Sequence, residues 1–273
     1  MNRLKWVMSR LLIVVAALYV VLVLMALFSD RLIFQPQPAS YSDSMQAQVL
    51  MRSNPPGELV KMKSGAQQIT GLYLPNPVAK YTLLFSHGNA EDLGDTLPIL
   101  TMYRDAGFSV FSYDYRGYGT SSGTPSEKGV YQDANAAYDY VTSQLHVPPE
   151  KLILFGRSVG CGPAIHLAAT RKVAGLIAEA PFITAFRVLT RYPLLPWDKF
   201  NNLHEIKNVH APVLVIHGRA DQVVPFWHGE RIFQNANSPK KFVPIDGAGH
   251  NDVLFVAGKQ YFSSLRDFAA SLN

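Results

Sequence analysis

Cysteine and charge are both scarce in this chain of 273 residues. The one cysteine, Cys161, cannot form an intramolecular disulfide, so cysteine usage does not identify the redox compartment. We interpret Cys161 as a small buried residue beside a serine. Charged residues make up 16% of the chain and hydrophobic residues 48%, a composition that excludes intrinsic disorder. The length is compatible with one large α/β domain.

Motifs for metals, nucleotides and nucleic acids are also missing. The histidines do not follow H-E-x-x-H or another ligand spacing and no cysteine pair exists, so we predict no metal and no cofactor. The glycines of residues 113–129 do not match a P-loop, and "GRSVGCG" lacks the Rossmann spacing. The net charge of +5 does not indicate nucleic acid, because Arg3, Lys5 and Arg10 supply three of these charges before a hydrophobic run.

That hydrophobic run, "LLIVVAALYVVLVLMALF" at residues 11–28, is long enough to cross a membrane. As a helix it would extend about 27 Å, close to the hydrocarbon thickness of a bilayer. A cleaved signal peptide is the main alternative, but its apolar stretch usually has about 7 to 15 residues. The run also ends in Leu27, Phe28 and Ser29, a poor cleavage site. We therefore predict an uncleaved signal anchor.

Basic residues are concentrated before this run. Only Arg31 follows it closely, beside Asp30, so the positive-inside rule predicts that residues 1–10 are cytoplasmic and that the rest of the chain is extracytoplasmic. Residues 29–57 contain "QPQP" and "NPPG", in which proline opposes regular structure, and we predict a linker. A single domain would then occupy residues 58–273.

Within that domain, short apolar runs alternate with helical patterns. Residues 58–75 indicate an opening hairpin that turns at Ser64-Gly65. Later strands are predicted at 81–87, 108–115, 151–156, 173–180, 212–218 and 241–247. Helices are predicted at 93–106, 127–145, 159–170, 225–236 and 252–271. This alternation predicts a mostly parallel sheet with helices on both faces and with reactive residues directly after the strands.

Ser158 is the candidate nucleophile. It lies in "GRSVG", after the strand "KLILF" and before the helical pattern "CGPAIHLAAT", which is the context of a nucleophile elbow. A strand that reverses at once into a helix strains the backbone of the serine, and side chains at Gly156 and Gly160 would collide with neighbouring elements. The alternative is a packed glycine turn without chemistry.

A serine hydroxyl needs a base, usually a histidine that is held by a carboxylate. In the fold that carries a nucleophile elbow, the three residues occur along the chain in the order serine, acid, histidine. Asp221 follows the strand "PVLVIHG" and His250 follows "KFVPIDG", each in the loop where such a residue is expected. Glu179, one strand earlier, is an alternative acid. Other candidates are given different roles: Asp246 and Asp252 are predicted to brace the loop, and His217 to be buried and hydrogen-bonded.

The oxyanion of a tetrahedral intermediate needs backbone donors. One is expected from Val159, directly after the nucleophile, and the other from Asn89 in the loop "HGNAEDLG". Gly88 would let this loop approach the substrate, and His87 is predicted to brace it. The alternative is a simple Gly-Asn turn.

Several segments together resemble the α/β-hydrolase superfamily, and within it the Bem46-like group and the related α/β-hydrolase-domain protein depalmitoylases. They are "SHGNAEDLG", "FSYDYRGYGTSSGTPSEKG", "ILFGRSVG", "PVLVIHGRAD" and "GAGHND", and the resemblance covers about residues 70–270. It implies that Ser158, Asp221 and His250 form a triad, with Asn89 and Val159 at the oxyanion hole.

The resemblance also implies that Arg116 and Tyr118 are structural. The chain departs from the depalmitoylases at its N-terminus, where those proteins carry a cysteine-rich segment and this chain has an apolar run without cysteine. A domain outside the cytoplasm could not reach cytosolic palmitoylated proteins, so the layout fits the membrane-anchored Bem46-like hydrolases better.

Residues 181–210 have the length of a small cap over the site. Its apolar side chains could line an acyl pocket or fill the core, and the core is the stronger expectation; they are Phe182, Phe186, Tyr192, Leu195 and Trp197. We predict a membrane-anchored serine hydrolase that cleaves ester or thioester bonds through an acyl-enzyme, with no nucleic-acid partner. A serine peptidase of the same fold and a non-enzymatic membrane-tethered interaction protein are the alternatives.

Overall fold

The computed structural model describes residues 2–44, 50, 54–195 and 197–272. The chain divides into two compact units, Met1–Gln35 and Pro36–Asn273. The predicted linker of residues 29–57 includes 45–49 and 51–53, which lie outside the described residues. The domain boundaries stay a prediction.

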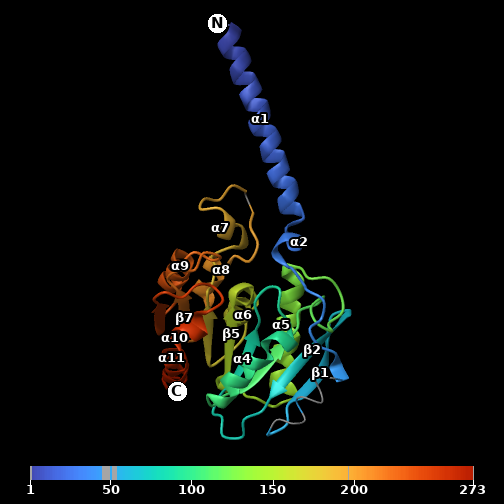
Figure 1. Cartoon of the computed structure of the whole chain (residues 1–273), viewed down its shortest axis with the longest axis vertical. Helices are drawn as coiled ribbons and strands as arrows, with labels where there is room; N and C mark the ends of the chain where they lie inside the picture. Colours follow the sequence, from blue (N-terminus) through green and yellow to red (C-terminus); the bar gives the residue numbers. More distant parts are fainter. Residues whose placement is uncertain (1, 45–49, 51–53, 196, 273) are drawn as a thin grey trace. The chain divides into compact units, whose positions relative to one another are not determined.

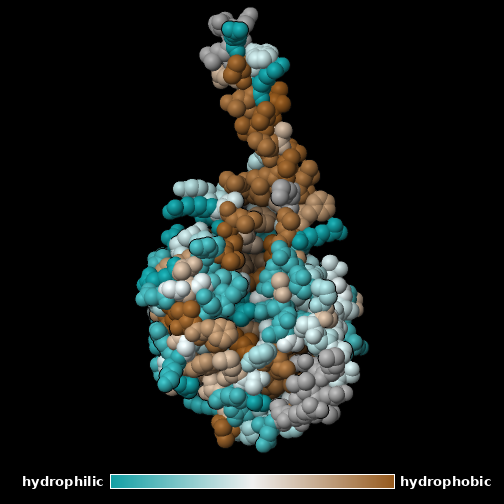
Figure 2. All heavy atoms as spheres, in the orientation of Figure 1, coloured by the Kyte–Doolittle hydropathy of each residue, from teal (hydrophilic) through white to brown (hydrophobic). Residues whose placement is uncertain are grey.

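The first unit is helical. Helix α1 spans Asn2–Leu27, and the short helix α2 spans Ser29–Ile33. Within α1, Lys5–Leu24 is long and apolar enough to cross a membrane, although a signal sequence near an N-terminus meets the same criteria. Figure 2 shows this helix as hydrophobic along most of its length. A helix that is apolar all round requires an apolar environment, which a bilayer supplies.

The second unit is built on a sheet of eight strands within the described residues (Figure 1). The strands are β1 (Glu58–Ser64), β2 (Gln67–Leu74), β3 (Thr82–Ser86), β4 (Ser109–Tyr113), β5 (Leu152–Arg157), β6 (Gly175–Glu179), β7 (Val213–Gly218) and β8 (Lys240–Ile245). Their order is β1-β2-β4-β3-β5-β6-β7-β8. Strand β2 is antiparallel to β1 and β4, and all other neighbours are parallel.

The opening hairpin and the later strands are confirmed. Ser64 pairs with Gln67 across the turn, and Gly65 adopts a φ of 61°, a conformation that glycine reaches without steric cost. The central strands are apolar at successive positions because both faces of the sheet are covered.

The helices of this unit are α4 (Leu93–Asp105), α5 (Glu127–Ser143), α6 (Cys161–Thr170), α7 (Ala185–Leu189), α8 (Asn202–Glu205), α9 (Trp227–Asn235), α10 (Val253–Ala257) and α11 (Lys259–Ala270). They cover both faces of the sheet. On β5, Phe155 packs against Tyr103 of α4, with ring centroids 5.2 Å apart. Leu154 points to the opposite face, since side chains alternate along a strand, and it is just as buried.

One expected helix is wrong in part. The pattern at residues 252–271 predicts a single helix, but the structure contains two, α10 and α11, joined at Gly258. Gly258 has a φ of 51° and a ψ of −120°, which no helical residue adopts. A glycine inside an apolar periodic pattern does not by itself reveal such a break, because helices also tolerate glycine.

Candidate active site

The elbow after β5 has the strained geometry that the sequence predicts. Ser158 adopts a φ of 53°, rare for a residue with a side chain. A Cβ at Gly160 would lie 2.1 Å from the carbonyl oxygen of Ser86, and one at Gly156 would lie 2.5 Å from the carbonyl oxygen of Gly160. Both positions therefore accept only glycine, and the serine is held at the start of a helical segment.

The structure brings Ser158, His250 and Asp221 together. His250 Nε2 lies 2.8 Å from Ser158 Oγ, and His250 Nδ1 lies 2.7 Å from Asp221 Oδ2. The three residues follow β5, β8 and β7, so the parallel sheet places their loops at the same edge. The side chain of His250 is 11% exposed and that of Asp221 is fully buried, so the carboxylate is shielded from water.

Asp221 is held as a carboxylate by a dense set of donors. The backbone N–H groups of Val223 and Val224 donate to Oδ1 at 2.9 and 2.8 Å. His217 Nε2 lies 3.3 Å from Oδ2. Burial alone would raise the pKa of Asp221, but the hydrogen bonds from His217, His250 and the Val224 N–H outweigh it and keep the pKa far below its usual range. His217 is buried and donates to the Val224 carbonyl at 2.9 Å, as predicted.

The alternative acid, Glu179, is bound elsewhere. The hydroxyl of Tyr261 donates to its Oε2, and Glu179 is fully buried next to Arg157 in the pairing of β5 with β6. Burial raises the pKa of Glu179, although Arg157 and the Tyr261 hydroxyl oppose this effect. Since His250 Nδ1 is already bonded to Asp221, the geometry favours Asp221.

The two other nearby acids brace the surrounding loops. Asp252 Oδ1 accepts from the Gly249 N–H at 2.7 Å, one residue before His250. Asp246 is exposed and pairs with Arg219 at 2.8 Å.

The candidate oxyanion loop follows β3. Asn89 Oδ1 accepts from the Tyr118 hydroxyl at 2.7 Å and from the Ala90 N–H at 3.0 Å, so its side chain is turned toward the loop after β4. Val159 directly follows Ser158 and is buried. The role of the Asn89 and Val159 N–H groups as oxyanion donors stays a prediction.

His87 packs under this loop and holds it by hydrogen bonds, as predicted. Its ring is fully buried and lies 4.2 Å from the ring of Tyr115, centroid to centroid. Its Nδ1 donates to the carbonyl of Gly88 at 2.8 Å, and its own carbonyl accepts from the Tyr115 hydroxyl at 2.7 Å. Burial lowers the pKa of His87, which keeps the ring neutral.

Sequence reasoning missed a carboxylate in the same loop. Glu91 Oε1 accepts from the Gly88 N–H at 2.5 Å, and Glu91 Oε2 forms an ion pair with Arg157, the residue before Ser158. Both residues stand inside the quoted motifs "HGNAEDLG" and "GRSVG". The sequence places an acid in one motif and an arginine in the other, but it does not show that the two side chains meet.

The predicted pocket residues do not share one environment. Phe182 is buried and packs edge-on against Phe200, with centroids 6.0 Å apart, so it belongs to the core. Tyr192 is 70% exposed and Trp197 is 40% exposed. Phe186 and Leu195 are half-buried. The acyl pocket stays a prediction.

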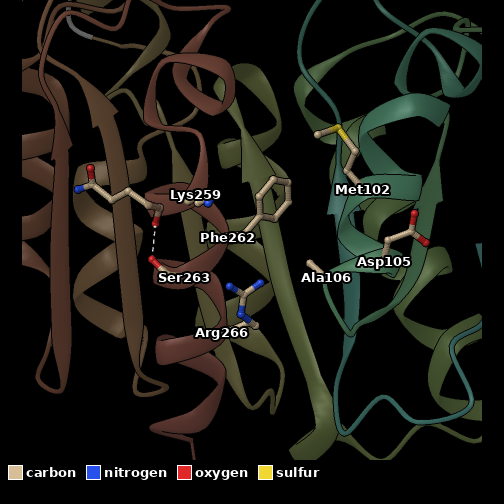
Figure 3. Close-up of a pocket in the computed structure, with 8 residues that line it drawn as sticks. Met102, Asp105, Ala106, Lys259, Phe262, Ser263 and Arg266 are labelled. Carbon is tan, nitrogen blue, oxygen red and sulfur yellow. Dashed lines mark hydrogen bonds between the residues drawn. The ribbon is translucent and has the colours of Figure 1, made fainter.

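A hollow of about 560 Å³ lies between α4 and α11, away from these residues (Figure 3). It is lined by Met102, Asp105, Ala106, Lys259, Gln260, Phe262, Ser263 and Arg266. Because α4 ends at Asp105 and leads into the start of β4, this hollow is near the sheet edge opposite Ser158. We assign it no part in the site.

The described residues also contain no group of three or more histidine, cysteine or acidic residues that could hold a metal ion. That the protein needs no cofactor stays a prediction.

Comparison with known proteins identifies the class. A family profile described as "Serine aminopeptidase, S33" matches residues 77–204. Alpha/beta hydrolase domain-containing protein 17B of Xenopus laevis is 41% identical over 202 residues, which are 71% of this chain and 68% of that protein. The Homo sapiens protein of the same name is 39% identical over 203 residues, with the same shares of 71% and 68%.

A solved structure gives the same fold. An esterase of Pyrococcus furiosus superposes with a TM-score of 0.72, covering 88% of this chain and 98% of that chain at 16% identity, a likeness that shows the fold alone. The chain is thus an α/β hydrolase of the serine hydrolase type. Within this class it belongs to the family of alpha/beta hydrolase domain-containing protein 17.

Proposed function

We propose that this protein is a membrane-anchored serine hydrolase that cleaves carboxylic ester or thioester bonds through an acyl-enzyme intermediate. The observation that carries the proposal is the continuous hydrogen-bond chain from Ser158 through His250 to Asp221, with distances of 2.8 and 2.7 Å. This is the arrangement that activates a serine for attack on an acyl carbon.

In the first half-reaction, His250 Nε2 takes the proton of Ser158 Oγ while the oxygen attacks the acyl carbonyl carbon. The carbonyl electrons move to its oxygen, which the N–H groups of Val159 and Asn89 would stabilise. When the tetrahedral intermediate collapses, the bond to the alcohol or thiol breaks and His250 returns its proton to that leaving group. The acyl group is then bound to Ser158 as an ester.

The second half-reaction runs these steps in reverse, with water in place of the alcohol or thiol. His250 takes a proton from water, the resulting hydroxide attacks the acyl carbon, and the proton returns to Ser158 Oγ as the carboxylic acid leaves. Asp221 holds the imidazole with its proton on Nδ1 throughout, and its strongly lowered pKa keeps it ionised beside the imidazolium.

The predicted cap, residues 181–210, favours a substrate with an apolar acyl group. Leu189, Tyr192 and Leu194 are 89%, 70% and 52% exposed, an unusual concentration of apolar surface in one short segment. A chain with a membrane-spanning segment would also encounter acyl lipids or acylated proteins at the bilayer surface. These features favour an acyl substrate without distinguishing an oxygen ester from a thioester.

A peptidase is the second candidate, because the matching family profile is described as a serine aminopeptidase. An aminopeptidase must bind the free amino group of its substrate, usually through a carboxylate near the nucleophile. Of the nearby acids, Glu179 is buried against Tyr261 and Glu91 is paired with Arg157, so neither is offered to a substrate.

Turnover assays on the full chain test the proposal. A series of p-nitrophenyl esters and acyl thioesters with increasing chain length would be compared with aminoacyl p-nitroanilides, using Ser158→Ala as the control. We expect the wild type to hydrolyse acyl substrates at least about 10³-fold faster than Ser158→Ala. Preferential turnover of the anilides would establish the peptidase instead, and equal rates for both proteins would reject an enzymatic role for Ser158.

A further inference from the structure

Two loops must be held at a fixed distance in the proposed reaction. One follows β3 and carries Asn89, and the other is the elbow after β5 that carries Ser158 and Val159. Strands β3 and β5 are neighbours, and Ser86 pairs with Gly156 at the end of their ladder. Beyond that pair the ladder ends, and the separation of the loops depends on the close packing of Gly160 against Ser86 and His87 and on side-chain contacts.

Glu91 connects the two loops directly. Its Oε1 accepts from the N–H of Gly88, the residue before Asn89, at 2.5 Å. Its Oε2 accepts from Nη2 of Arg157, the residue before Ser158. One carboxylate thus binds Gly88, directly before Asn89, and Arg157, two residues before Val159.

The contact is close and mostly shielded from water. The side chains of Arg157 and Glu91 are 20% and 16% exposed. A Cβ at Gly88 would lie 2.8 Å from Glu91 Oε1 and 3.6 Å from Arg157 Nε, so the backbone of Gly88 rests directly on the pair. The absence of a side chain at Gly88 is what allows this packing.

Arg157 is also influenced by a second acid. Glu179 lies opposite it in the register of β5 with β6. Burial alone would lower the pKa of Arg157, but Glu91 and Glu179 outweigh it and raise the pKa. The arginine therefore stays charged in its ion pair with Glu91, and Glu179 is itself anchored by the Tyr261 hydroxyl.

We infer that Glu91 and Arg157 are positioning residues that set the distance between the Asn89 and Val159 N–H groups and so complete the oxyanion hole. Neither residue touches the reacting atoms; each acts through the backbone of its neighbour. The inference rests on the proposed function. Donors displaced by a fraction of an ångström stabilise the transition state less while leaving ground-state binding unchanged.

Four variants of the full chain test the inference. Glu91→Ala removes both contacts, Arg157→Gln removes the ion pair, and Arg157→Lys keeps the charge. We expect Glu91→Ala and Arg157→Gln each to lower kcat for an acyl ester about 10- to 100-fold with KM within about 3-fold, and Arg157→Lys to retain most of the rate. The double variant Glu91→Ala/Arg157→Gln should be no worse than the poorer single variant, because both act as one unit.

Arg171→Gln is the matched control. Arg171 also pairs with an acid from another element, Asp139 of α5 at 3.3 Å, and its guanidinium also contacts Asn135 and Tyr138 of the same helix. We expect it to keep the wild-type kcat. Melting temperatures of all variants separate loss of fold from loss of positioning.

Two readouts go beyond turnover. The affinity for an acyl trifluoromethyl ketone, which forms an oxyanion adduct with the serine, should fall by the same factor as kcat/KM across the series. Hydrogen–deuterium exchange at Gly88 should become faster in Glu91→Ala, because the N–H loses its acceptor.

The outcomes are distinct. Variants that keep the wild-type kcat, or that lose kcat only in proportion to a lowered melting temperature, would overturn the positioning role while the proposed function stands. A wild type that turns over no acyl substrate would overturn the proposed function instead. A kcat loss that tracks the weakened ketone affinity, with Arg171→Gln unaffected, supports the inference.

Discussion

Ser158 is held in a backbone conformation that a residue with a side chain rarely adopts. A φ of 53° at this residue is sustained because Gly156 and Gly160 leave room for the chain to reverse. The strain fixes the hydroxyl toward His250 before any substrate arrives, which is the physical meaning of preorganisation at such a turn.

Replacing Asp221 tests the assignment of the acid. Asp221→Asn keeps the size of the side chain but allows the imidazole to adopt the wrong tautomer, so we expect kcat to fall by about 10⁴-fold with the fold intact. Rates of ester hydrolysis and a circular dichroism melt would check both parts. Glu179→Gln should lose far less activity, and the reverse order of the two variants would transfer the role of the acid to Glu179.

The buried carboxyl of Asp114, near the start of α4, predicts that stability depends on pH. Asp114 accepts from the Tyr41 hydroxyl at 2.5 Å and from the Leu93 N–H at 2.9 Å, and burial raises its pKa to about 7 despite the lowering effect of the tyrosine. The folded state therefore binds a proton more tightly than the unfolded state, where the pKa is about 3.9. This stabilisation is complete below the unfolded pKa and is lost as the pH rises to the folded one.

We accordingly expect the wild type to lose stability relative to Asp114→Asn between about pH 4 and pH 7, by at most about 1.4 kcal/mol per pH unit. Above this window the difference should be constant. Melting temperatures of both proteins across this range are the measurement, and parallel curves from pH 4 to pH 7 would show that Asp114 does not titrate as described.

At the scale of elements, the sequence predicted what depends on local patterns. The strands, the hairpin at Gly65 and the loops that carry Ser158, Asp221 and His250 follow from apolar runs and motif positions. The pairing of Glu91 with Arg157 does not, because no local pattern says which of the 25 basic residues a given carboxylate will meet. The hydrogen bond from the Ser40 N–H to the Asp92 carboxylate joins residues 52 positions apart, and it could not be predicted for the same reason.

Gly258, which divides the last helix, and Gly160 of the elbow differ in the space around them. A Cβ at Gly258 would find its nearest atom 4.0 Å away, so Gly258→Ala adds backbone strain alone and should cost about 1 to 3 kcal/mol with activity kept. Gly160→Ala places a Cβ 2.1 Å from the Ser86 carbonyl and should displace the elbow from the oxyanion loop. We expect it to abolish ester turnover, which chemical denaturation and rate measurements on both variants would verify. A functional Gly160→Ala would contradict the packing described for the elbow.

At the scale of the whole molecule, the N-terminal helix predicts a location at a membrane. Lys5–Leu24 is long and apolar enough to cross a bilayer. If it is an uncleaved anchor, the full-length chain should stay in the membrane pellet after extraction with alkaline carbonate. Release into the supernatant, or recovery of a chain that lacks these residues, would show a cleaved signal sequence.

The orientation across the membrane is a separate prediction. The basic residues before the apolar run predict a cytoplasmic N-terminus and an extracytoplasmic domain. Protease added outside sealed, right-side-out cells or spheroplasts should then digest the domain, and protection of the domain would reverse the assignment. The side on which the domain lies determines which acylated molecules it can meet.

The central claim, that Ser158 is an activated nucleophile, is tested most directly by covalent labelling. A fluorophosphonate probe added to the full chain should modify Ser158, as identified by mass spectrometry of the labelled peptide. We predict rapid labelling of the wild type and none of Ser158→Ala. Equal labelling of both proteins, or a wild type that is not labelled at Ser158, would contradict the account.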